Sequence, residues 1–398
     1  MSRSRTVLVA GAGIGGLAAA IALANAGFRV LVFERDKTPD TSGAGIQLSP
    51  NATRALASLS ALDILTAKAV EPDELVVANA GNRAVLATMP LGKTMREKFA
   101  FPYLVCLRAD LHDTLAKIAA DHPDIELRYG SALMDFAGHS RGVTAQIERN
   151  RQTEEVLGTA LIGADGIRSQ IRARLHPGTN PRHSGMSAWR ATIPLTALPE
   201  EMQRKTPVRV WLGPGAHLVH YPVGDGKEIN LVAVTMDRQT TESWGEETSA
   251  AEVAQRFAQW NETPRSVIAA ASQFRRWSIY EAPLLTSWGK GATTLLGDAA
   301  HAMFPFIAQG AASALEDAVT LAASLHNNED IPAALRVYEQ LRIPRTQKIQ
   351  SAARNVGRVY HLAKPWSYGR DMVMERIGGE GLLRQNAWIY RGGAGTDR

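Results

Sequence analysis

Cysteine is almost absent from this sequence, with Cys106 alone among 398 residues. A single cysteine excludes an internal disulfide, a metal site built from several cysteines and the redox-active cysteine pair of a disulfide reductase. Cys106 lies in the apolar stretch Tyr103–Leu107. We therefore expect a buried core thiol and not a reactive one.

Long apolar runs are also missing, since no run reaches the roughly 18–20 residues that a membrane span needs. Residues 1–5 lead directly into the strand-like stretch Thr6–Ala10, which leaves no room for a secretory signal. A composition of 45% hydrophobic and 21% charged residues is typical of globular proteins in solution. These features predict a cytoplasmic protein without a membrane span.

Basic residues exceed acidic ones, 44 against 39, but they do not form a cluster. The densest basic stretch, Arg168–Arg174, alternates with apolar residues as one face of a helix does. Such a pattern favours a solvated surface or attraction for small anions. We therefore do not expect a nucleic acid as partner.

The order of predicted elements indicates an α/β protein with a second, β-rich domain. Strands are predicted at Thr6–Ala10, Arg29–Glu34, Ala160–Ala164 and Thr293–Leu296, and helices at Ile14–Ala26, Arg108–Ala120 and Gly310–Ser324. Residues 184–276 instead contain alternating β-type segments, at Val208–Leu212, His217–Tyr221 and Ile229–Val234, broken by Gly-Pro turns. This predicts a Rossmann-like domain that is discontinuous in sequence (1–72, 100–180 and 280–345), a mostly antiparallel β domain (73–99 and 181–279) and a C-terminal helical segment (346–398).

A glycine-rich motif, Gly11-Ala-Gly-Ile-Gly-Gly16, joins the first strand to the first helix. Gly11, Gly13 and Gly16 permit a tight turn, and the helix beginning at Ile14 offers free N–H groups to a pyrophosphate. Glu34 ends the next strand at the position of a ribose acceptor, with Arg35 beside it. An acid there favours FAD or NAD over NADP.

Two further segments place aspartates at the carboxyl ends of predicted strands. They are Gly163-Ala-Asp-Gly-Ile-Arg-Ser169, with Asp165, and Leu296-Gly-Asp-Ala-Ala-His301, with Asp298. In an open parallel sheet both carboxylates face the cofactor crevice. Each segment alone is unremarkable, but their order after the glycine motif is specific.

With these three motifs, the chain resembles the flavoprotein aromatic hydroxylases, and most of all the salicylate and 3-hydroxybenzoate hydroxylase branch. The resemblance extends over nearly the whole chain and includes Gly43–Asn51, Leu107–Leu111, Trp211–Pro214, Phe304–Ala312 and Leu315–Asp317. It implies the para-hydroxybenzoate hydroxylase-like fold. It also implies bound FAD, with NADH or NADPH and O₂ as co-substrates. NAD(P)H would bind only transiently, since a second dinucleotide motif is absent.

The resemblance also implies roles for individual residues. Glu34 would bind the adenosine ribose, Arg108 the diphosphate region and Asp298 the ribityl chain or diphosphate, while Asp165 would bridge the flavin and nicotinamide sites. Expected beside the isoalloxazine are Pro305, Gln309, Gly310, Ala311 and Ala312, with Gln47 as a weaker candidate. The backbone N–H groups at Gly310–Ala312 suit the flavin edge on which negative charge develops.

On the substrate side, alternation in the strand predicted at 217–221 places His217 and Tyr221 on one face and His220 on the other. The two histidine rings diverge, so we expect no metal site. In the similar hydroxylases this strand helps to deprotonate the substrate phenol, which makes His217 a candidate base and Tyr221 a candidate hydroxyl. Spacing does not decide which face looks at the substrate, so His220 stays an alternative, as does simple packing of all three.

Other predicted substrate contacts are Gln309 as an orienting group, Arg190 as a carboxylate-binding fork and Trp211 as an apolar wall. Trp189, Phe304 and Phe306 are further candidates for that wall. Each has an ordinary alternative as a loop residue, a salt bridge or core.

The resemblance predicts that NAD(P)H reduces FAD, that reduced flavin captures O₂ as a C4a-hydroperoxide, and that one oxygen atom passes to a small phenolic acid such as salicylate or a hydroxybenzoate. One alternative is hydroxylation or epoxidation of a larger, non-phenolic compound. A second is a non-catalytic binding protein. The substrate, the position of hydroxylation, NADH against NADPH and monomer against homodimer stay open.

Overall fold

The computed structural model describes residues 5–38, 44–237 and 245–392. A parallel five-stranded sheet forms the centre of the Rossmann-like part, in the order β18-β11-β1-β2-β7. Its strands are β1 (Thr6–Ala10), β2 (Arg29–Glu34), β7 (Ile125–Tyr129), β11 (Ala160–Gly163) and β18 (Thr293–Leu295). Strands far apart in sequence therefore build one sheet.

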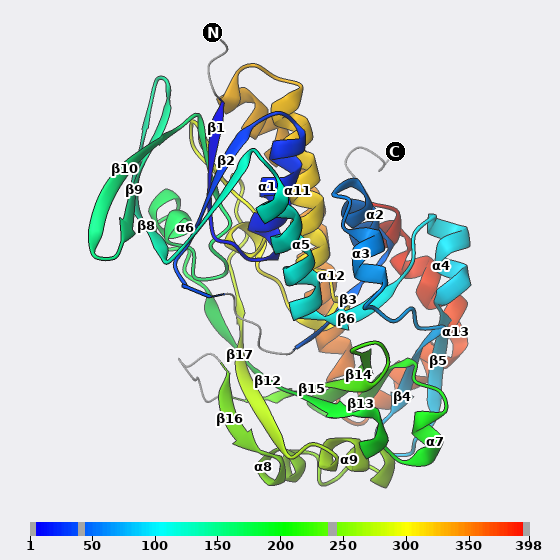
Figure 1. Cartoon of the computed structure of the whole chain (residues 1–398). Coiled ribbons are helices and arrows are strands. Elements are labelled where there is room, and N and C mark those ends of the chain that lie inside the picture. The colour runs from blue at the N-terminus through cyan, green and yellow to red at the C-terminus, as the bar shows by residue number, and fades with distance from the viewer. Residues whose placement is uncertain (1–4, 39–43, 238–244, 393–398) are drawn as a thin grey trace.

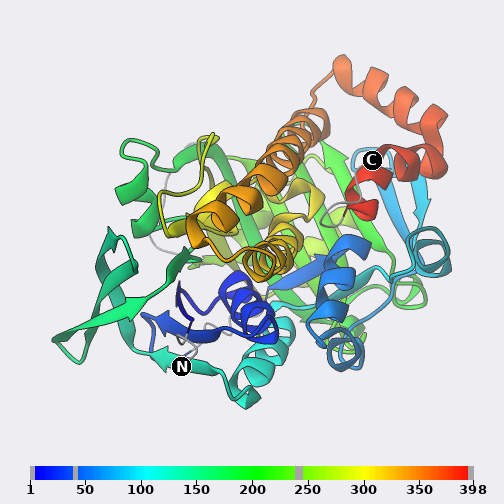
Figure 2. The ribbon, with the colours of Figure 1, turned by 90° about the horizontal axis from the view of Figure 1, so that it is seen from above.

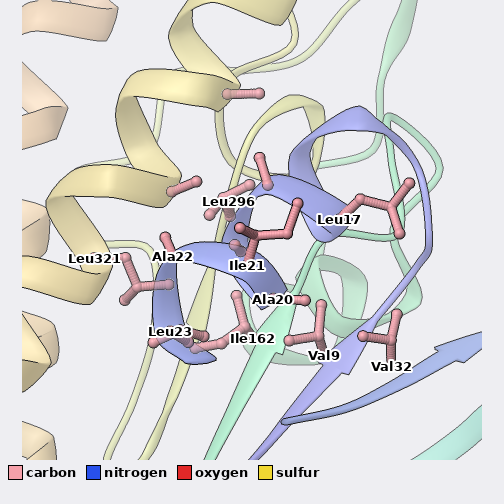
Figure 3. Close-up of a cluster of buried hydrophobic side chains, with 14 of the residues drawn as sticks. Val9, Leu17, Ala20, Ile21, Ala22, Leu23, Val32, Ile162, Leu296 and Leu321 are labelled. Atoms are coloured by element: carbon pink, nitrogen blue, oxygen red, sulfur yellow. The ribbon is translucent and has the colours of Figure 1, made fainter. Parts of the chain in front are cut away.

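Alanine-rich helices cover this sheet closely. Helix α1 (Ile14–Asn25) lies between the strands and helix α11 (Gly310–His326), with Ile21 and Leu23 among the buried contacts (Figure 3). A side chain at Gly15 would come within 2.8 Å of Leu296, so a glycine allows this close approach. Helix α5 (Arg108–Asp121) packs against α1 from the other side. The fold class predicted from the sequence is confirmed in this part.

A three-stranded antiparallel sheet extends from the Rossmann-like part, and no strand is predicted there from the sequence. It consists of β8 (Ser131–His139), β9 (Gly142–Arg149) and β10 (Gln152–Gly158), in the order β10-β9-β8. Asn150 and Arg151 both have positive φ, 52° and 64°, in the two-residue turn between β9 and β10. That is the backbone of a type I′ hairpin, here without the glycine that usually marks one.

The second large sheet has eight strands in the order β16-β17-β12-β15-β14-β13-β4-β5, and all neighbours are antiparallel except β13 and β4. The strands are β4 (Glu74–Asn79), β5 (Val85–Pro90), β12 (Arg182–Pro194), β13 (Val208–Gly213), β14 (Ala216–Val223), β15 (Glu228–Met236), β16 (Glu246–Ser249) and β17 (Gln273–Glu281). Helices α8 (Ala250–Arg256) and α9 (Glu262–Ala269) pack under its far face (Figure 1). Its other face looks toward the Rossmann-like part.

Shorter elements connect the two sheets. Strands β3 (Gly45–Leu48) and β6 (Leu104–Leu107) pair antiparallel between them. The remaining short elements are α2 (Pro50–Ser58), α3 (Leu62–Thr66), α4 (Gly92–Phe99), α6 (Gln170–Leu175), η1 (Leu195–Ala197), α7 (Glu200–Gln203), α10 (Asp298–His301) and η2 (Pro305–Ile307). Cys106 is buried in β6, and burial raises the pKa of its thiol, which agrees with the predicted core role.

Two long helices end the described chain. Helix α12 (Ile331–Tyr360) runs from the Rossmann-like part to the large sheet, and α13 (Trp366–Arg391) turns back along β5 (Figure 2). Any side chain at Gly379 would overlap the backbone oxygen of Thr88 in β5, so a glycine is required for this contact. Within the described ranges, no helix combines the length and the apolar character needed to cross a membrane.

Candidate cofactor and active site

The glycine motif after β1 is tightly packed on its inner side and open on its outer side. Gly11 has a φ of +103°, and a side chain at Gly11 would overlap the backbone oxygen of Ala164. A side chain at Gly16 would likewise overlap the backbone oxygen of Gly11. At Gly13, the N-cap of α1, no atom lies within 4 Å of where a Cβ would be, and no side chain caps the helix beginning at Ile14. The free N–H groups therefore meet open space of the kind a pyrophosphate requires.

Glu34 is fixed beside this motif at the end of β2. The backbone N–H of Ala12 donates to its Oε2 at 2.8 Å, and that of Asp36 donates to Oε1 at 3.0 Å. Arg35 is exposed, with its Nε 3.6 Å from Asp36 Oδ1. His112 of α5 adds a contact that the motif does not predict, because its Nε2 lies 2.9 Å from the Ala12 backbone oxygen. The carboxylate is thus held beside the glycine motif, and its contact with a ribose stays a prediction.

Asp165 follows β11 and holds the start of α6. Its Oδ2 accepts from the backbone N–H of Gln170 at 2.9 Å, while its buried Oδ1 has no hydrogen-bond partner among the described residues. Burial raises the pKa of this carboxyl, and hydrogen bonds from Ser169 and the backbone act in the opposite direction. This supports one part of the role predicted for Asp165, because one carboxylate oxygen is left available as an acceptor for a ligand.

Asp298 begins α10, after β18, and it is exposed to solvent. The surrounding chain nevertheless desolvates its carboxyl and raises its pKa, while nearby His301 and Arg108 lower it. A carboxyl that is accessible and yet partly desolvated is characteristic of a ligand-facing position. Arg108, which starts α5 next to the β3–β6 pair, thus lies near Asp298, and its place at a diphosphate stays a prediction.

The loop from Phe304 to Ala312 leads from α10 into α11. Pro305 is exposed at the start of η2, and Ala308 adopts a positive φ of 53° before the helix begins. No atom lies within 4 Å of a Cβ built on Gly310, and the first turn of α11 has no side-chain cap. Ala311 and Ala312 follow in that turn, so their N–H groups are free to meet an anionic group, and their contact with a flavin edge stays a prediction.

Gln309 differs from the prediction that it orients the substrate. Its side chain is 1% exposed, and both ends of its amide are engaged within the chain. Asn51 Nδ2 donates to Gln309 Oε1 at 3.0 Å, and Gln309 Nε2 donates to Ser49 Oγ at 2.8 Å. Gln309 therefore ties the loop to helix α2 and its N-cap. The predicted role of Gln309 is therefore corrected from a contact with the substrate to a residue that fixes the shape of the loop.

His217 and Tyr221 lie on the face of the large sheet that looks toward this loop. The ring of His217 contacts that of Phe306 edge-on, with centroids 5.2 Å apart. Tyr221 lies against Gly45 of β3, where any added side chain would come within 2.8 Å of the tyrosine ring. Gln47, two residues on, accepts from Tyr103 Oη at 2.7 Å. The alternation predicted for 217–221 is therefore correct, and the structure identifies the face.

His220 and Trp211 lie behind the sheet, which corrects their predicted contact with the substrate. Trp211 Nε1 donates to His220 Nε2 at 3.2 Å, and Trp211 packs with Trp189 and Phe257 in the core between the sheet and helices α8 and α9. Burial and nearby Arg209 lower the pKa of His220 to about 3 and keep it a neutral acceptor. The sheet separates these side chains from the face that carries His217. Of the aromatic residues predicted as an apolar wall, Phe304 and Phe306 lie on the face that carries His217, and their contact with a substrate stays a prediction.

Arg190 and Asn230 place donors on the same face as Tyr221. Asn230 is paired with Tyr221 in the β14–β15 register, and Arg190 is paired with Val232 in the β12–β15 register. Arg190 Nε and Asn230 Nδ2 are both buried without a hydrogen-bond partner among the described residues. Asn230 Oδ1 accepts from the backbone N–H of Gly45 at 2.7 Å, which fixes the direction of its amide. Buried donors without acceptors are rare, and they indicate a ligand that supplies acceptors.

His361 is the main feature of this site that the sequence does not reveal. Its Nε2 lies 2.8 Å from Nδ1 of His217, although 144 residues separate the two histidines in sequence. Burial lowers the pKa of His217 well below its usual value, and the proximity of His361 lowers it further. No local motif announces this pair because His361 reaches the site only through the length of α12.

Comparison with known proteins decides the family. A model described as an FAD binding domain matches residues 4–353. The chain belongs to this family of FAD-dependent monooxygenases. It is 36% identical to "3-hydroxybenzoate 6-hydroxylase" of Klebsiella oxytoca over 393 residues, 98% of this chain and 97% of that protein. It is 33% identical to "3-amino-4-hydroxybenzoate 2-monooxygenase" of Streptomyces cremeus, over 99% of this chain and 97% of that protein.

The fold agrees with solved structures of this family. A salicylate hydroxylase in a substrate complex superposes with a TM-score of 0.84 at 26% identity, over 99% of this chain and 97% of that one. The resemblance predicted from the glycine, Asp165 and Asp298 motifs is thereby confirmed, as is the para-hydroxybenzoate hydroxylase-like fold. FAD as the cofactor is supported by the family. Gly43, the first residue of the motif at 43–51, lies outside the described residues.

Replacing Gly13 by valine is expected to abolish most FAD retention without unfolding the protein. The new side chain would fill the open side of the motif and block the approach of the pyrophosphate to the helix N-terminus. Loss of even one charge-assisted hydrogen bond, about 1.5–3 kcal/mol, weakens binding about 10–100-fold. Flavin absorbance relative to protein absorbance measures this. Gly138→Val, which also fills open space but far away in β8, is the control, and equal flavin content in both variants would contradict the assignment.

Proposed function

We propose that this protein adds one oxygen atom to a small phenolic acid of the salicylate or hydroxybenzoate type, with O₂ and NADH or NADPH as co-substrates. The observation that carries the proposal is the common sheet face of His217, Tyr221 and Arg190, which looks toward the loop at 304–312. A base, a hydroxyl and a cation are the groups that a phenolic acid requires. The curated relatives named above act on hydroxylated benzoates, as their names state.

Bound FAD, once reduced, supplies the activated oxygen in this reaction. The chain itself binds and orients the aromatic acid and removes the phenol proton. His217 is suited to accept that proton because its lowered pKa keeps the imidazole neutral near pH 7. Burial raises the pKa of Tyr221, so its hydroxyl stays protonated and serves as a donor. Removing the phenol proton makes the ring electron-rich at the carbon to be hydroxylated.

Arg190 and Asn230 are proposed to hold the carboxylate of the substrate. Burial lowers the pKa of Arg190, and nearby Tyr221 raises it while nearby Arg108 lowers it. Its guanidinium contacts the ring of Trp277, with Cζ 5.5 Å from the ring centroid. A carboxylate would supply the acceptors that Arg190 Nε and Asn230 Nδ2 lack. It would therefore orient the ring with its hydroxyl toward the other polar groups on this face.

Replacing Arg190 by methionine is expected to raise the dissociation constant of the aromatic acid about 10–100-fold, because a hydrogen bond to a charged group contributes about 1.5–3 kcal/mol. Flavin-spectrum titration of the oxidised enzyme measures the constant. The matching benzamide should bind the variant and the wild type about equally, since it carries no charge. Arg209→Met, on the opposite face of the same sheet, is the control. An unchanged constant for the acid would exclude Arg190 from the carboxylate site.

The proposed activity is tested by recording the visible spectrum of the purified protein and following NADH and NADPH oxidation with a series of hydroxybenzoates. One aromatic acid should accelerate the oxidation and be recovered with one additional oxygen atom. Acceleration only by larger, non-phenolic compounds would replace the proposed substrate class. A protein that takes up no FAD would exclude the activity altogether. These experiments do not test the cytoplasmic location, which stays a prediction.

A further inference from the structure

We propose that His361 is a positioning and relay residue that carries the substrate's phenol proton from His217 to the solvent. The inference rests on the proposed function, in which His217 is the base. The Nδ1 atom of His217 and the Nε2 atom of His361 lie 2.8 Å apart, a hydrogen-bond distance in which one nitrogen carries the proton. That contact leaves Nε2 of His217 as the ring nitrogen for the substrate.

The burial of the two rings differs in the way a relay requires. His217 is 2% exposed within the sheet, whereas His361, the residue that follows α12, is half-buried. A proton accepted by His217 thus has no direct route to water through its own ring. The second ring bridges the distance between the buried base and the surface.

Aromatic packing holds the pair in place. Phe306 contacts both rings edge-on, with centroids 5.2 Å from His217 and 5.8 Å from His361. Tyr360 contacts His217 at 5.5 Å, and the backbone N–H of Gly215 donates to the His361 carbonyl at 3.1 Å. A side chain at Gly357 would overlap Phe306, so a glycine one turn earlier in α12 makes room for the clamp. The loop at 304–312, which is expected beside the flavin, therefore also orients the base.

The transfer balances without a further reactant. Before it, His217 carries its proton on Nδ1 and donates to His361 Nε2. The phenol O–H bond breaks as an N–H bond forms at His217 Nε2, and the Nδ1 proton moves to His361 Nε2. His361 releases the proton on its own Nδ1 to water. The phenolate stays behind, opposite an Nε2–H of His217 that can donate to it.

The charges around the pair favour release over storage of the proton. The rings that contact it belong to Phe306 and Tyr360, and the nearby charged groups are Arg370, whose Nη1 donates to the Tyr360 carbonyl at 2.9 Å, and Asp371, which is paired with Arg370. Burial and then Arg370 lower the pKa of His361 to about 4. Neither ring therefore keeps a positive charge at neutral pH, and after the transfer both rings are neutral again, each now with its proton on Nε2.

The test is stopped-flow mixing of the oxidised, FAD-loaded protein with a hydroxybenzoate, without NAD(P)H, while phenolate absorbance is recorded. We expect His361→Gln and His361→Ala to slow phenolate formation at least about tenfold, part of the 10²–10⁴-fold that proton transfer groups contribute, with the ligand's dissociation constant within twofold of wild type. Added imidazole should restore the rate of His361→Ala, because it fills the place of the missing ring. His139→Gln, an exposed histidine in β8, is the control.

Three outcomes separate the relay from its alternatives. Wild-type rates in both variants, or slowing without imidazole rescue and with a changed dissociation constant, would overturn the relay and leave His361 with a packing role. If the wild-type protein forms no phenolate and hydroxylates no phenolic acid, the proposed function fails and the relay fails with it. Slower phenolate formation that added imidazole restores, with an unchanged dissociation constant of the ligand, supports the relay over a packing role.

Discussion

Replacing His217 by asparagine is expected to slow hydroxylation about 10²–10⁴-fold, the usual contribution of a general base, while NAD(P)H still reduces the flavin at close to the wild-type rate. Asparagine is smaller, and its amide can still donate a hydrogen bond to His361, but it cannot take up a proton. Oxygen should then be consumed with release of H₂O₂ in place of product. Anaerobic reduction kinetics, product yield and H₂O₂ yield measured on one preparation separate these steps.

The control for this prediction lies three residues along the same strand. His220→Asn changes a histidine that faces α8 and α9 and contacts Trp211, so it should affect stability and leave coupling unchanged. Wild-type coupling of His217→Asn, or an equal loss in His220→Asn, would remove His217 from the role of base. Together the two variants therefore test which face of β14 takes part in the reaction, and not only the role of His217.

Local sequence patterns predicted the parts of this site that residues close in sequence form. They could not predict the parts that long-range packing determines. The glycine motif and Glu34 lie within about 20 residues of each other, so the sequence contains the whole arrangement. Period-two alternation likewise placed His217 and Tyr221 together. It could not choose their face, because the packing of α8 and α9 against one face and of Phe306 against the other determines that choice from distant parts of the chain.

The errors have the same physical origin. Gln309 occupies the predicted loop, but Asn51 and Ser49, more than 250 residues earlier, engage both ends of its amide. His361 lies at the end of a 30-residue helix whose direction no motif specifies. The resemblance to the hydroxylases included residues 315–317 but assigned them no function. The structure shows that Glu316 and Asp317 form a buried ion-pair network beneath the loop.

Replacing Arg342 by methionine is expected to lower the free energy of unfolding by about 3–5 kcal/mol, because it leaves buried charge without its partner. Arg342 lies at 2.7 Å from both Glu316 and Asp317, and all three side chains are almost fully buried. Urea unfolding followed by circular dichroism measures the change. Arg358→Met, exposed on the same helix, should stay within about 0.5 kcal/mol of wild type. An equally small effect at Arg342 would contradict the assigned role of the network.

The acid dependence of stability should change in the same variant. Burial alone raises the pKa of Asp317, but nearby His301 and Arg342, which also hydrogen-bond to it, bring the pKa down to about 2. A carboxyl whose pKa is lower in the folded state stabilises the fold above its unfolded pKa of about 3.9, and that contribution disappears as the pH falls through the folded value. Wild-type stability from this group should therefore be lost between about pH 4 and pH 2.

In Arg342→Met the pKa of Asp317 rises, so acid unfolding should begin at a higher pH than in the wild type. Flavin retention should decline with it, because Glu316 accepts from Asn51 at 2.9 Å and Asn51 in turn holds Gln309 in the loop expected beside the flavin. Acid unfolding followed by circular dichroism and by flavin fluorescence tests both. An unchanged acid midpoint would show that Arg342 does not set the pKa of Asp317. Flavin release well before unfolding in this variant would show that the network serves the loop more than the fold.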